Sequence, residues 1–270
     1  TSVLTDYRFN GIKNIKKKMD YELTDQKYWH DYIQNIDTTF GFIEAHDSIL
    51  TCNKDRSNLR LYKKVAQKYT LQQEYNAFTG KAKGDKRREG DLKTPLGIYD
   101  ITKKISKLDS FYGPLAFVTS YPNIYDTYRG KNGSGIWIHG LPIEQERDDY
   151  TRGCIAINND NLVCLDKEIN INSTLLIINE KKTTKNVDKK VLASLLSDLY
   201  KWRYSWIYND VDTYLAFYSP EFIRADGMNF ERFIKYKTRI FAKNEEKEII
   251  FTNINVIPYP SQENTFQITF

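Results

Sequence analysis

A histidine and a cysteine are the two side chains of this sequence best suited to act together in catalysis. His139 ends one apolar segment, and Cys154 lies between Gly153 and another apolar segment. The thiolate of cysteine is the nucleophile, and with a pKa of about 8.5 only a few per cent of an ordinary thiol is ionised near neutral pH. A neighbouring imidazole that lowers this pKa to about 6 makes most of the population thiolate. The pair therefore predicts covalent catalysis through Cys154, although a lone cysteine is more often a small buried apolar residue.

The segment before His139 has the alternation of a β-strand. Ile136 and Ile138 face one side and predict a core, while Trp137 and His139 share the other side and predict a site. Gly140 ends the strand. Because no Asp or Asn lies within the motif to orient the second ring nitrogen of the histidine, the carbonyl of Gly140 is the nearest candidate acceptor.

The turn before Cys154 is predicted to display the thiol. Gly153 can adopt a positive φ, which lets the chain turn sharply beneath the cysteine. Backbone N–H groups at Gly153 and Cys154 could then bind a developing oxyanion, for which one well-placed donor typically contributes about 10²–10³ in rate. The charged run 144–149, which precedes this turn, is predicted to be an exposed loop.

In these residues and their order, the sequence resembles the L,D-transpeptidase (YkuD-type) cysteine enzymes of bacterial cell-wall metabolism. Their signature is a His followed by Ser/Thr-X-Gly-Cys and an apolar residue, which corresponds here to His139 and residues 151–155. Residues 90–99, GDLKTPLGIY, resemble their K-T-P-x-G-x-[YF] segment, and residues 135–140, GIWIHG, resemble their G-I-x-I-H-G strand. The three segments occur in the order typical of the family.

The resemblance assigns roles to individual residues. It implies that Cys154 is the nucleophile, that His139 is the base and that the Gly140 carbonyl orients the imidazole. Arg152 stands where many family members have a second His, so no role of that His is transferred to this chain.

The rest of the chain up to residue 180 predicts an α+β arrangement around a β-rich domain. Short strand-like segments separated by turns predict a sandwich or barrel, with residues 48–52 and 59–62 as a hairpin. Residues 1–40 are predicted to be helical, and Thr24 is the expected N-cap of a helix with an apolar stripe. That stripe is expected to dock on the catalytic domain; the alternative is a homodimer contact. Cys164 is expected to pack in a core.

Beyond residue 190 the apolar period changes to 3.6 residues. Helices are predicted at 192–206, 211–218 and 230–241, followed by strands at 248–257 and 265–270. This order resembles the nuclear transport factor 2-like fold, a curved sheet wrapped by helices, although the chain ends where more strands would be expected. The predicted parts are a helical N-terminal segment (1–40), a YkuD-type catalytic domain (41–180), a linker (181–190) and a nuclear transport factor 2-like α+β domain (191–270).

This pairing of domains resembles the L,D-carboxypeptidases that trim peptidoglycan stem peptides in helical or curved Gram-negative bacteria. The resemblance implies thiolate attack on the carbonyl of the diaminopimelate residue in a tetrapeptide stem, release of the terminal D-Ala, and hydrolysis of the thioester. An L,D-transpeptidase shares the motif and differs only in its acyl acceptor, an amine from a second stem. A non-catalytic wall-binding scaffold that keeps the shape of the motif is the remaining alternative.

A carboxypeptidase must recognise a free terminal carboxylate. Arg152 is the first candidate for this contact because a guanidinium binds a carboxylate bidentately, and Lys131 or Arg147 is the second. Arg152 could instead pair with acidic residues of the run 144–149. Trp137 is expected either to form a wall of the groove or to support His139 by packing.

Composition argues against several other classes. The net charge of +5 is spread over Lys-rich patches, so no nucleic-acid partner is predicted. No apolar run is long enough to span a membrane, and the start at Thr1 without a visible signal peptide is consistent with a processed, periplasmic protein. The three His and three Cys residues lack metal-ligand spacing, so neither a metal nor a cofactor is predicted. The odd number of cysteines predicts at least one free thiol.

Overall fold

The fold is α+β, as the sequence predicts, and it divides into two units. The computed structural model describes residues 3–143, 148–181 and 186–270. One unit comprises residues 43–186 and 257–269, and we call it the barrel unit. The other comprises residues 1–42, 187–256 and 270, and we call it the helical unit.

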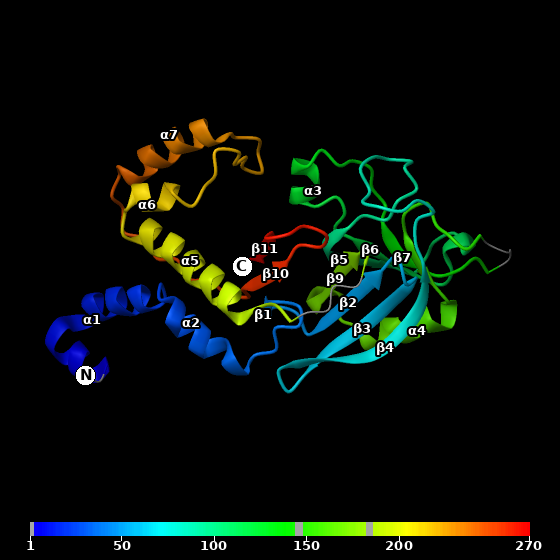
Figure 1. Cartoon of the computed structure of the whole chain (residues 1–270), viewed down its shortest axis with the longest axis horizontal. Coiled ribbons are helices and arrows are strands. Elements are labelled where there is room, and N and C mark those ends of the chain that lie inside the picture. The colour runs from blue at the N-terminus through cyan, green and yellow to red at the C-terminus, as the bar shows by residue number, and fades with distance from the viewer. Residues whose placement is uncertain (1–2, 144–147, 182–185) are drawn as a thin grey trace. The chain divides into compact units, whose positions relative to one another are not determined.

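The main strands of the barrel unit close into a barrel (Figure 1). The order around it is β2-β3-β4-β8-β7-β6-β5-β9. Most neighbours are antiparallel, but β2 pairs in parallel with β9, and β7 pairs in parallel with β8. The strands are β2 (Ser48–Asn53), β3 (Asn58–Val65), β4 (Lys68–Phe78), β5 (Gly97–Ile105), β6 (Ala116–Thr119), β7 (Trp137–His139), β8 (Ile155–Ile157) and β9 (Thr174–Asn179).

Side-chain alternation along these strands fills the barrel. Leu50 and Cys52 lie on one face of β2 and belong to the barrel core, as do Leu59 and Leu61 of β3. The predicted hairpin is confirmed, because β2 and β3 pair in antiparallel register and Cys52 lies opposite Leu59.

Short helices fill the connections of the barrel unit. They are α3 (Ile124–Tyr128), α4 (Asn159–Glu168) and the 3₁₀ turns η2 (Ser110–Tyr112) and η3 (Ile171–Ser173). Leu162 and Leu165 form the inner face of α4 and pack in the barrel core. The expectation that Cys164 packs in a core is wrong. Cys164 is exposed, because at 100° per residue its position falls on the outer face of the helix that these leucines define.

The helical unit begins with α1 (Val3–Glu22), which is interrupted at Gly11, and α2 (Gln26–Tyr32), which is followed by η1 (Ile33–Asn35). α2 lies beside α5 (Lys189–Ile207) (Figure 1), and the rings of Trp29 and Tyr200 are 5.0 Å apart. The expectation that the apolar stripe docks on the catalytic domain is therefore wrong, since the stripe packs on α5 within its own unit. The predicted N-cap is also wrong by one residue: Asp25, not Thr24, accepts the hydrogen bond of the Lys27 amide.

The remainder of the helical unit has an aromatic core. α6 (Val211–Leu215) and α7 (Phe230–Phe241) bring Tyr214, Phe233 and Phe241 together. The strand predicted at 248–257 is largely wrong, because only Asn255–Pro258 forms one (β10). The carbonyl of Ile249, within the expected strand, instead accepts a hydrogen bond from the Arg203 side chain at 2.6 Å. A separate three-stranded sheet has the order β1 (Phe42–Ile43), β10 and β11 (Phe266–Thr269), and β11 belongs to the barrel unit.

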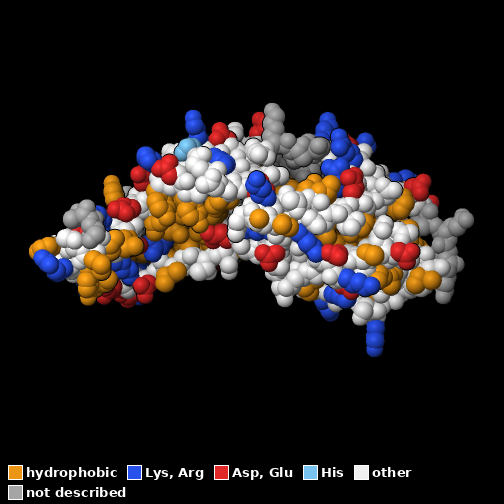
Figure 2. All heavy atoms as spheres, turned by 90° about the horizontal axis from the view of Figure 1, so that it is seen from below, with side chains coloured by type: hydrophobic (Ala, Val, Ile, Leu, Met, Phe, Trp, Pro, Cys, Tyr) orange, Lys and Arg blue, Asp and Glu red, His pale blue; other side chains and the backbone are white. Residues whose placement is uncertain are grey.

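The surface matches the spread of charge along the sequence. On the face shown in Figure 2, Lys and Arg side chains are interspersed with Asp and Glu side chains. Among the helices of the described residues, none is long and apolar enough to cross a membrane.

Candidate active site

His139 is held at the centre of the barrel wall. It ends β7, which pairs with β6 on one side and β8 on the other, and it is 1% exposed. Its Nδ1 lies 2.7 Å from the carbonyl oxygen of Gly140. Because a carbonyl can only accept a hydrogen bond, Nδ1 carries the proton of the neutral ring. Nε2 is then the nitrogen with the lone pair, which is the form a general base requires.

Tyr112 fixes this turn, and sequence reasoning missed it. The carbonyl of Tyr112 accepts a hydrogen bond from the amide of Gly140 at 2.8 Å. Its ring packs edge-on against the imidazole of His139, with ring centroids 5.1 Å apart. Tyr112 therefore positions both the imidazole and the carbonyl that orients it. Nothing in the local sequence could reveal this, because Tyr112 lies on a separate 3₁₀ turn.

Asn159 is a second residue that sequence reasoning missed. Its Oδ1 accepts from the amide of Leu141 at 2.8 Å, and its Nδ2 donates to the carbonyl of Leu141 at 3.1 Å. This pair of bonds fastens the chain after His139 to the start of α4. A Cβ on Gly140 would lie 2.1 Å from Asn159 Oδ1, so a side chain here would displace the Asn159 amide from the turn.

Cys154 lies immediately before β8 and is partly exposed. It is a free cysteine, and its Sγ donates to the carbonyl of Gly135 at 3.3 Å. Gly153 has the positive φ predicted for the turn, 140°. A side chain there would also place its Cβ 2.9 Å from the carbonyl oxygen of Lys93. The thiol thus lies on a turn that glycine alone can make.

The pairing of β7 with β8 brings the histidine and the cysteine to one face. His139 is opposite Ala156 in parallel register, so these two side chains point to the same side of the barrel wall. Cys154 is two residues before Ala156, and because strand side chains alternate it points to that side as well. Adjacent strands lie about 4.8 Å apart and two residues span about 6.6 Å. The Cα atoms are therefore roughly 8 Å apart on a diagonal, a separation that the two side chains can bridge.

Thr151 holds the turn that carries the thiol. Its Oγ1 donates to the carbonyl of Cys154 at 2.7 Å and accepts from the amide of Gly153 at 3.0 Å. Its backbone pairs with Thr79 and Lys81 at the end of β4. Because the Gly153 N–H is bound to Thr151, it is not directed at a substrate in this structure. Gly153 contributes its backbone conformation instead.

Arg152 and Trp137 flank the pair. Arg152 is exposed, and among the described residues it forms no ion pair with Asp148 or Asp149. Glu144 and Glu146, the other acidic partners considered, lie outside the described residues. Trp137 is partly exposed and packs against the ring of Tyr112 at 5.3 Å. Both of its expected roles, groove wall and packing support, are compatible with this position.

Of the two second-choice contacts for the substrate carboxylate, Lys131 and Arg147, only Lys131 belongs to the described residues. Lys131 is buried, with its side chain 0% exposed, and its ammonium is bound by Asp85 and Asp126 at 2.8 Å each. It is therefore not placed to reach a substrate. Arg147 lies outside the described residues. Among the described residues, no group of three or more His, Cys, Asp or Glu side chains is arranged to hold a metal ion.

Two protein families match the chain. Residues 47–177 match the L,D-transpeptidase catalytic domain (YkuD), and residues 194–270 match the Cds6 C-terminal NTF2-like domain. The first match includes His139 and Cys154, and the second includes most of α5 and all that follows it.

Similar proteins extend over one or both of the matched parts of the chain. The helical cell shape determining protein Pgp2 from Campylobacter jejuni is 38% identical, with a TM-score of 0.83 over 91% of this chain and 86% of that chain. Bd1075 from Bdellovibrio bacteriovorus is 26% identical, with a TM-score of 0.66 over 83% and 81%. The putative L,D-transpeptidase YafK of Escherichia coli (strain K12) is 33% identical over 111 residues, which is 40% of this chain and 42% of YafK. The match thus spans less than half of that relative.

Proposed function

Since this chain belongs to the L,D-transpeptidase (YkuD) family and carries an NTF2-like domain after the catalytic domain, we propose that it is a cysteine-type peptidoglycan L,D-carboxypeptidase. It removes the terminal D-Ala from tetrapeptide stems and leaves tripeptides. The observation that carries the proposal is the contact of His139 Nδ1 with the Gly140 carbonyl at 2.7 Å, because it makes Nε2 the basic nitrogen of a ring on the face of the barrel wall that Cys154 shares.

In the proposed mechanism, His139 accepts one proton and donates it again in each half-reaction. Nε2 of His139 takes the thiol proton, and Sγ attacks the carbonyl carbon of the diaminopimelate residue. The tetrahedral intermediate then breaks its C–N bond, and the imidazolium gives its proton to the nitrogen of the departing D-Ala. Water, deprotonated by Nε2, attacks the resulting thioester and the C–S bond breaks. The imidazolium then returns its proton to the sulfur, which restores the thiol and the neutral imidazole.

The oxyanion of each intermediate needs a donor close to the nucleophile. The Gly153 amide is bound to Thr151 Oγ1, so we assign this donor to the backbone amide of Cys154 itself. We keep Arg152 as the contact for the terminal carboxylate, because it is exposed and adjacent to the Gly153–Cys154 turn.

The pairing of domains supports hydrolysis over cross-linking. The motif is common to both reactions, so residues near the thiol do not distinguish water from an amine as the acyl acceptor. The similarity to a helical cell shape determining protein extends over 91% of this chain and so includes both matched domains. We therefore propose a role in cell shape and, because its substrate is peptidoglycan, a periplasmic location.

Purified muropeptides test this function. The protein is incubated with tetrapeptide and pentapeptide monomers, and the products are weighed by mass spectrometry beside those of the Cys154→Ala variant. We expect tripeptide monomers from the tetrapeptide only with the unmodified protein. New dimers would identify a transpeptidase, and unchanged muropeptides would favour a non-catalytic wall-binding protein.

A further inference from the structure

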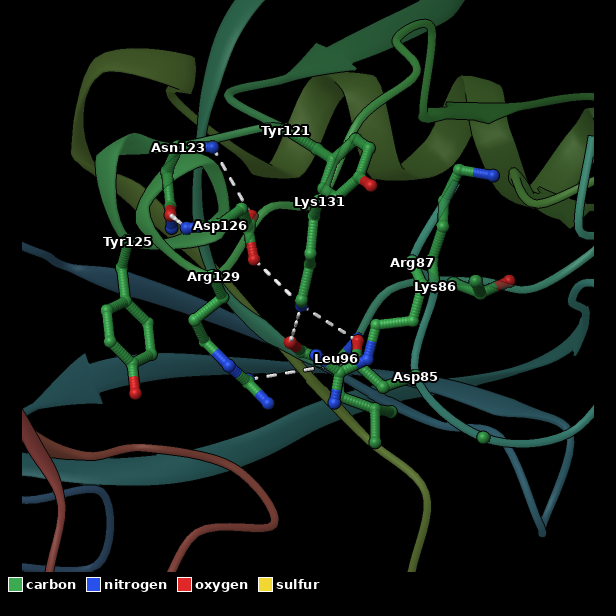
Figure 3. Close-up of polar contacts among 12 residues, drawn as sticks. Asp85, Lys86, Arg87, Leu96, Tyr121, Asn123, Tyr125, Asp126, Arg129 and Lys131 are labelled. Atoms are coloured by element: carbon green, nitrogen blue, oxygen red, sulfur yellow. Dashed lines mark hydrogen bonds and ion pairs between the residues drawn. The ribbon is translucent and has the colours of Figure 1, made fainter. Parts of the chain in front are cut away.

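A buried lysine joins two chain segments of the barrel unit (Figure 3). Lys131 Nζ lies 2.8 Å from Asp85 Oδ1 and 2.8 Å from Asp126 Oδ1, and 3.4 Å from the carbonyl oxygen of Leu96. Asp85 Oδ1 also accepts from the amide of Leu96 at 2.9 Å, and Arg129 approaches the other oxygen of Asp85 at 3.6 Å. The ammonium is therefore enclosed by two carboxylates and a carbonyl oxygen, and because its side chain is 0% exposed it acts as a fixed crosslink.

The first of these segments leads directly to the thiol. It runs from Asp126 in α3 through Lys131 to Gly135, just before β7. The carbonyl of Gly135 accepts the hydrogen bond of Cys154 Sγ at 3.3 Å. Tyr121 steadies the same segment, because its hydroxyl donates to the carbonyl of Asn132 at 2.9 Å.

The second segment, residues 80–96, lies against the turn that carries the thiol. The amide of Lys81 donates to the carbonyl of Thr151 at 3.1 Å. The carbonyl oxygen of Lys93 lies so close to Gly153 that a Cβ there would be 2.9 Å away. Asp85 and Leu96, which both bind Lys131, belong to this segment.

Asn132 ties the two segments together beside the lysine. Its amide donates to the carbonyl of Arg87 at 3.1 Å, and its Oδ1 accepts from the amide of Glu89 at 2.9 Å. The segment that ends at Gly135 and the segment that contains Lys93 are thus fixed relative to each other, and Cys154 lies where they meet.

We propose that Lys131 is a positioning residue for the catalytic thiol: its ammonium, enclosed by Asp85 and Asp126, fixes the two segments that contact Gly153 and Cys154. This inference rests on the proposed function, in which Cys154 is the nucleophile. Lys131 touches neither substrate nor thiol and acts through the carbonyls of Gly135 and Lys93. It replaces the sequence-based expectation that Lys131 binds the substrate carboxylate.

The design of a test must respect the burial of the cluster. Removing Lys131 alone would leave the fully buried carboxylate of Asp126 without its cation, which is strongly destabilising. The double variant Lys131→Met/Asp126→Asn removes one charge of each sign, and Asp85 keeps its contacts with Leu96 and Arg129. A matched control, Lys104→Met/Asp166→Asn, removes a partly exposed ion pair of the same barrel unit.

The measurement is the pH profile of Cys154 alkylation by iodoacetamide, in full-length protein that also carries Cys164→Ser, well below the melting temperature of each variant. For Lys131→Met/Asp126→Asn we expect the midpoint of the profile to rise and the rate at neutral pH to fall about tenfold, because the thiolate loses its fixed surroundings. With a tetrapeptide substrate, kcat should fall by up to about 10²-fold while KM changes less, as expected for a misplaced nucleophile. The control should match the unmodified protein in both assays.

Other outcomes have distinct meanings. A lower melting temperature with an unchanged alkylation profile and unchanged kcat would overturn the inference, because it would reveal a purely structural lysine. If the double variant does not fold, Asn132→Ala is used in its place. It removes the hydrogen bond from the Glu89 amide to Asn132 Oδ1, which joins the two segments at an exposed residue. We expect the same shift with a smaller amplitude, and an unchanged profile overturns the inference. If the unmodified protein releases no D-Ala, the proposed function fails, whereas the alkylation profiles still test the positioning.

Discussion

Two neighbouring asparagines show how much the site depends on single contacts. Asn159 binds both the amide and the carbonyl of Leu141 and so holds the turn after His139. Asn158 instead caps α4 by accepting from the amide of Asp160, and among the described residues its side chain makes no hydrogen bond to this turn. The two residues are therefore a matched pair in which only one is connected to the imidazole.

We expect Asn159→Ala to lower kcat/KM about 10–100-fold. The variant removes the two hydrogen bonds that hold the turn after His139, so the imidazole is no longer aligned with the thiol. Asn158→Ala should cost about 1 kcal/mol of stability through the lost cap and leave kcat/KM unchanged. Release of D-Ala from tetrapeptide, with melting curves of both variants, is the measurement. Equal activity losses in the two variants would contradict the assignment of Asn159 to the site.

The three cysteines should differ sharply in reactivity. Cys52 is fully buried in β2, and burial raises the pKa of its thiol to about 12. Cys154 is partly exposed and shares a face of the barrel wall with His139, and Cys164 is exposed on α4. At pH 6 we expect iodoacetamide to modify Cys154 first and Cys52 only after unfolding. Peptide mapping after timed labelling measures this order, and early modification of Cys52 would contradict it.

At the scale of residues, the sequence predicts what is local. His139, Gly140, Gly153 and Cys154 lie in two short segments whose alternation and glycines carry the information, and the Gly140 contact and the positive φ of Gly153 were anticipated. Tyr112, Asn159 and Thr151 were not, because their roles depend on side chains and backbone that meet only after folding. Lys131 had the correct charge for its expected role but lies in a buried cluster, and a sequence does not report burial of a lone lysine.

At the scale of elements, the parallel pair β7 and β8 is the feature that assembles the site. Antiparallel neighbours can be joined by a tight turn, whereas parallel neighbours need a long connection. Here the connection runs in sequence from Gly140 to Cys154. The loop 80–96 then packs beside the turn that ends this connection.

Asp91 should stabilise this loop in a pH-dependent way. Burial raises the pKa of its carboxyl, but hydrogen bonds from the Arg87, Arg88 and Lys93 amides and from Lys86 outweigh burial and hold that pKa well below its usual range. A carboxylate whose pKa is lower in the folded state than in the unfolded state stabilises the fold. This stabilisation is fully present above the unfolded-state pKa of about 3.9 and is lost as pH falls through the folded-state pKa. We expect Asp91→Asn to lower the free energy of unfolding by roughly 1–3 kcal/mol at pH 7.

Urea titrations of both proteins between pH 7 and pH 3 measure this effect. The difference between the unmodified protein and Asp91→Asn should be constant down to about pH 5 and shrink below it. A difference that stays the same at pH 3, or that grows, would show that the carboxylate charge is not what holds the loop.

Element prediction succeeded where the apolar period was strong. The helices at 189–207 and 230–241 and the hairpin β2–β3 follow from their patterns. Of the strand expected at 248–257, only the end forms, as part of β10. The carbonyl of Ile249 is bound by the Arg203 side chain of α5, a contact between distant segments. The order of the strands around the barrel could not be predicted either, since it depends on which edges meet.

At the scale of the whole molecule, the NTF2-like domain matters because the catalytic motif alone does not determine the acyl acceptor. The domain has its own aromatic core and an internal cation. Lys237 Nζ lies 3.9 Å from the centre of the Trp206 ring and 4.9 Å from that of Tyr214. A homodimer contact through the N-terminal segment stays a prediction, which sedimentation of the full chain would test.

Lys237 should make the stability of this domain increase with pH in the alkaline range. Burial, with a smaller contribution from Arg224, lowers the pKa of Lys237 to about 8. Between that value and the unfolded-state value of about 10.4, the unfolded chain binds more protons than the folded one, so stability rises with pH. Relative to Lys237→Met, the unmodified protein should gain roughly 1–2 kcal/mol between pH 7 and pH 10.

Denaturant unfolding followed by tryptophan fluorescence measures this gain, because Trp206 lies beside the ammonium. Lys235→Met, at an exposed position of the same helix, is the control and should run parallel to the unmodified protein. If the Lys237→Met and unmodified curves also run parallel from pH 7 to pH 10, the ammonium is not desolvated in the folded state.

Trapping the thioester on Cys154 tests most directly whether this residue is the nucleophile. The protein is mixed with tetrapeptide muropeptide, quenched in acid within the first turnovers and weighed intact, and the modified peptide is then sequenced. We predict an added mass equal to the muropeptide less D-Ala, located on Cys154 and absent from Cys154→Ala, which should also release no D-Ala. Release of D-Ala by Cys154→Ala at the rate of the unmodified protein would show that Cys154 is not the nucleophile.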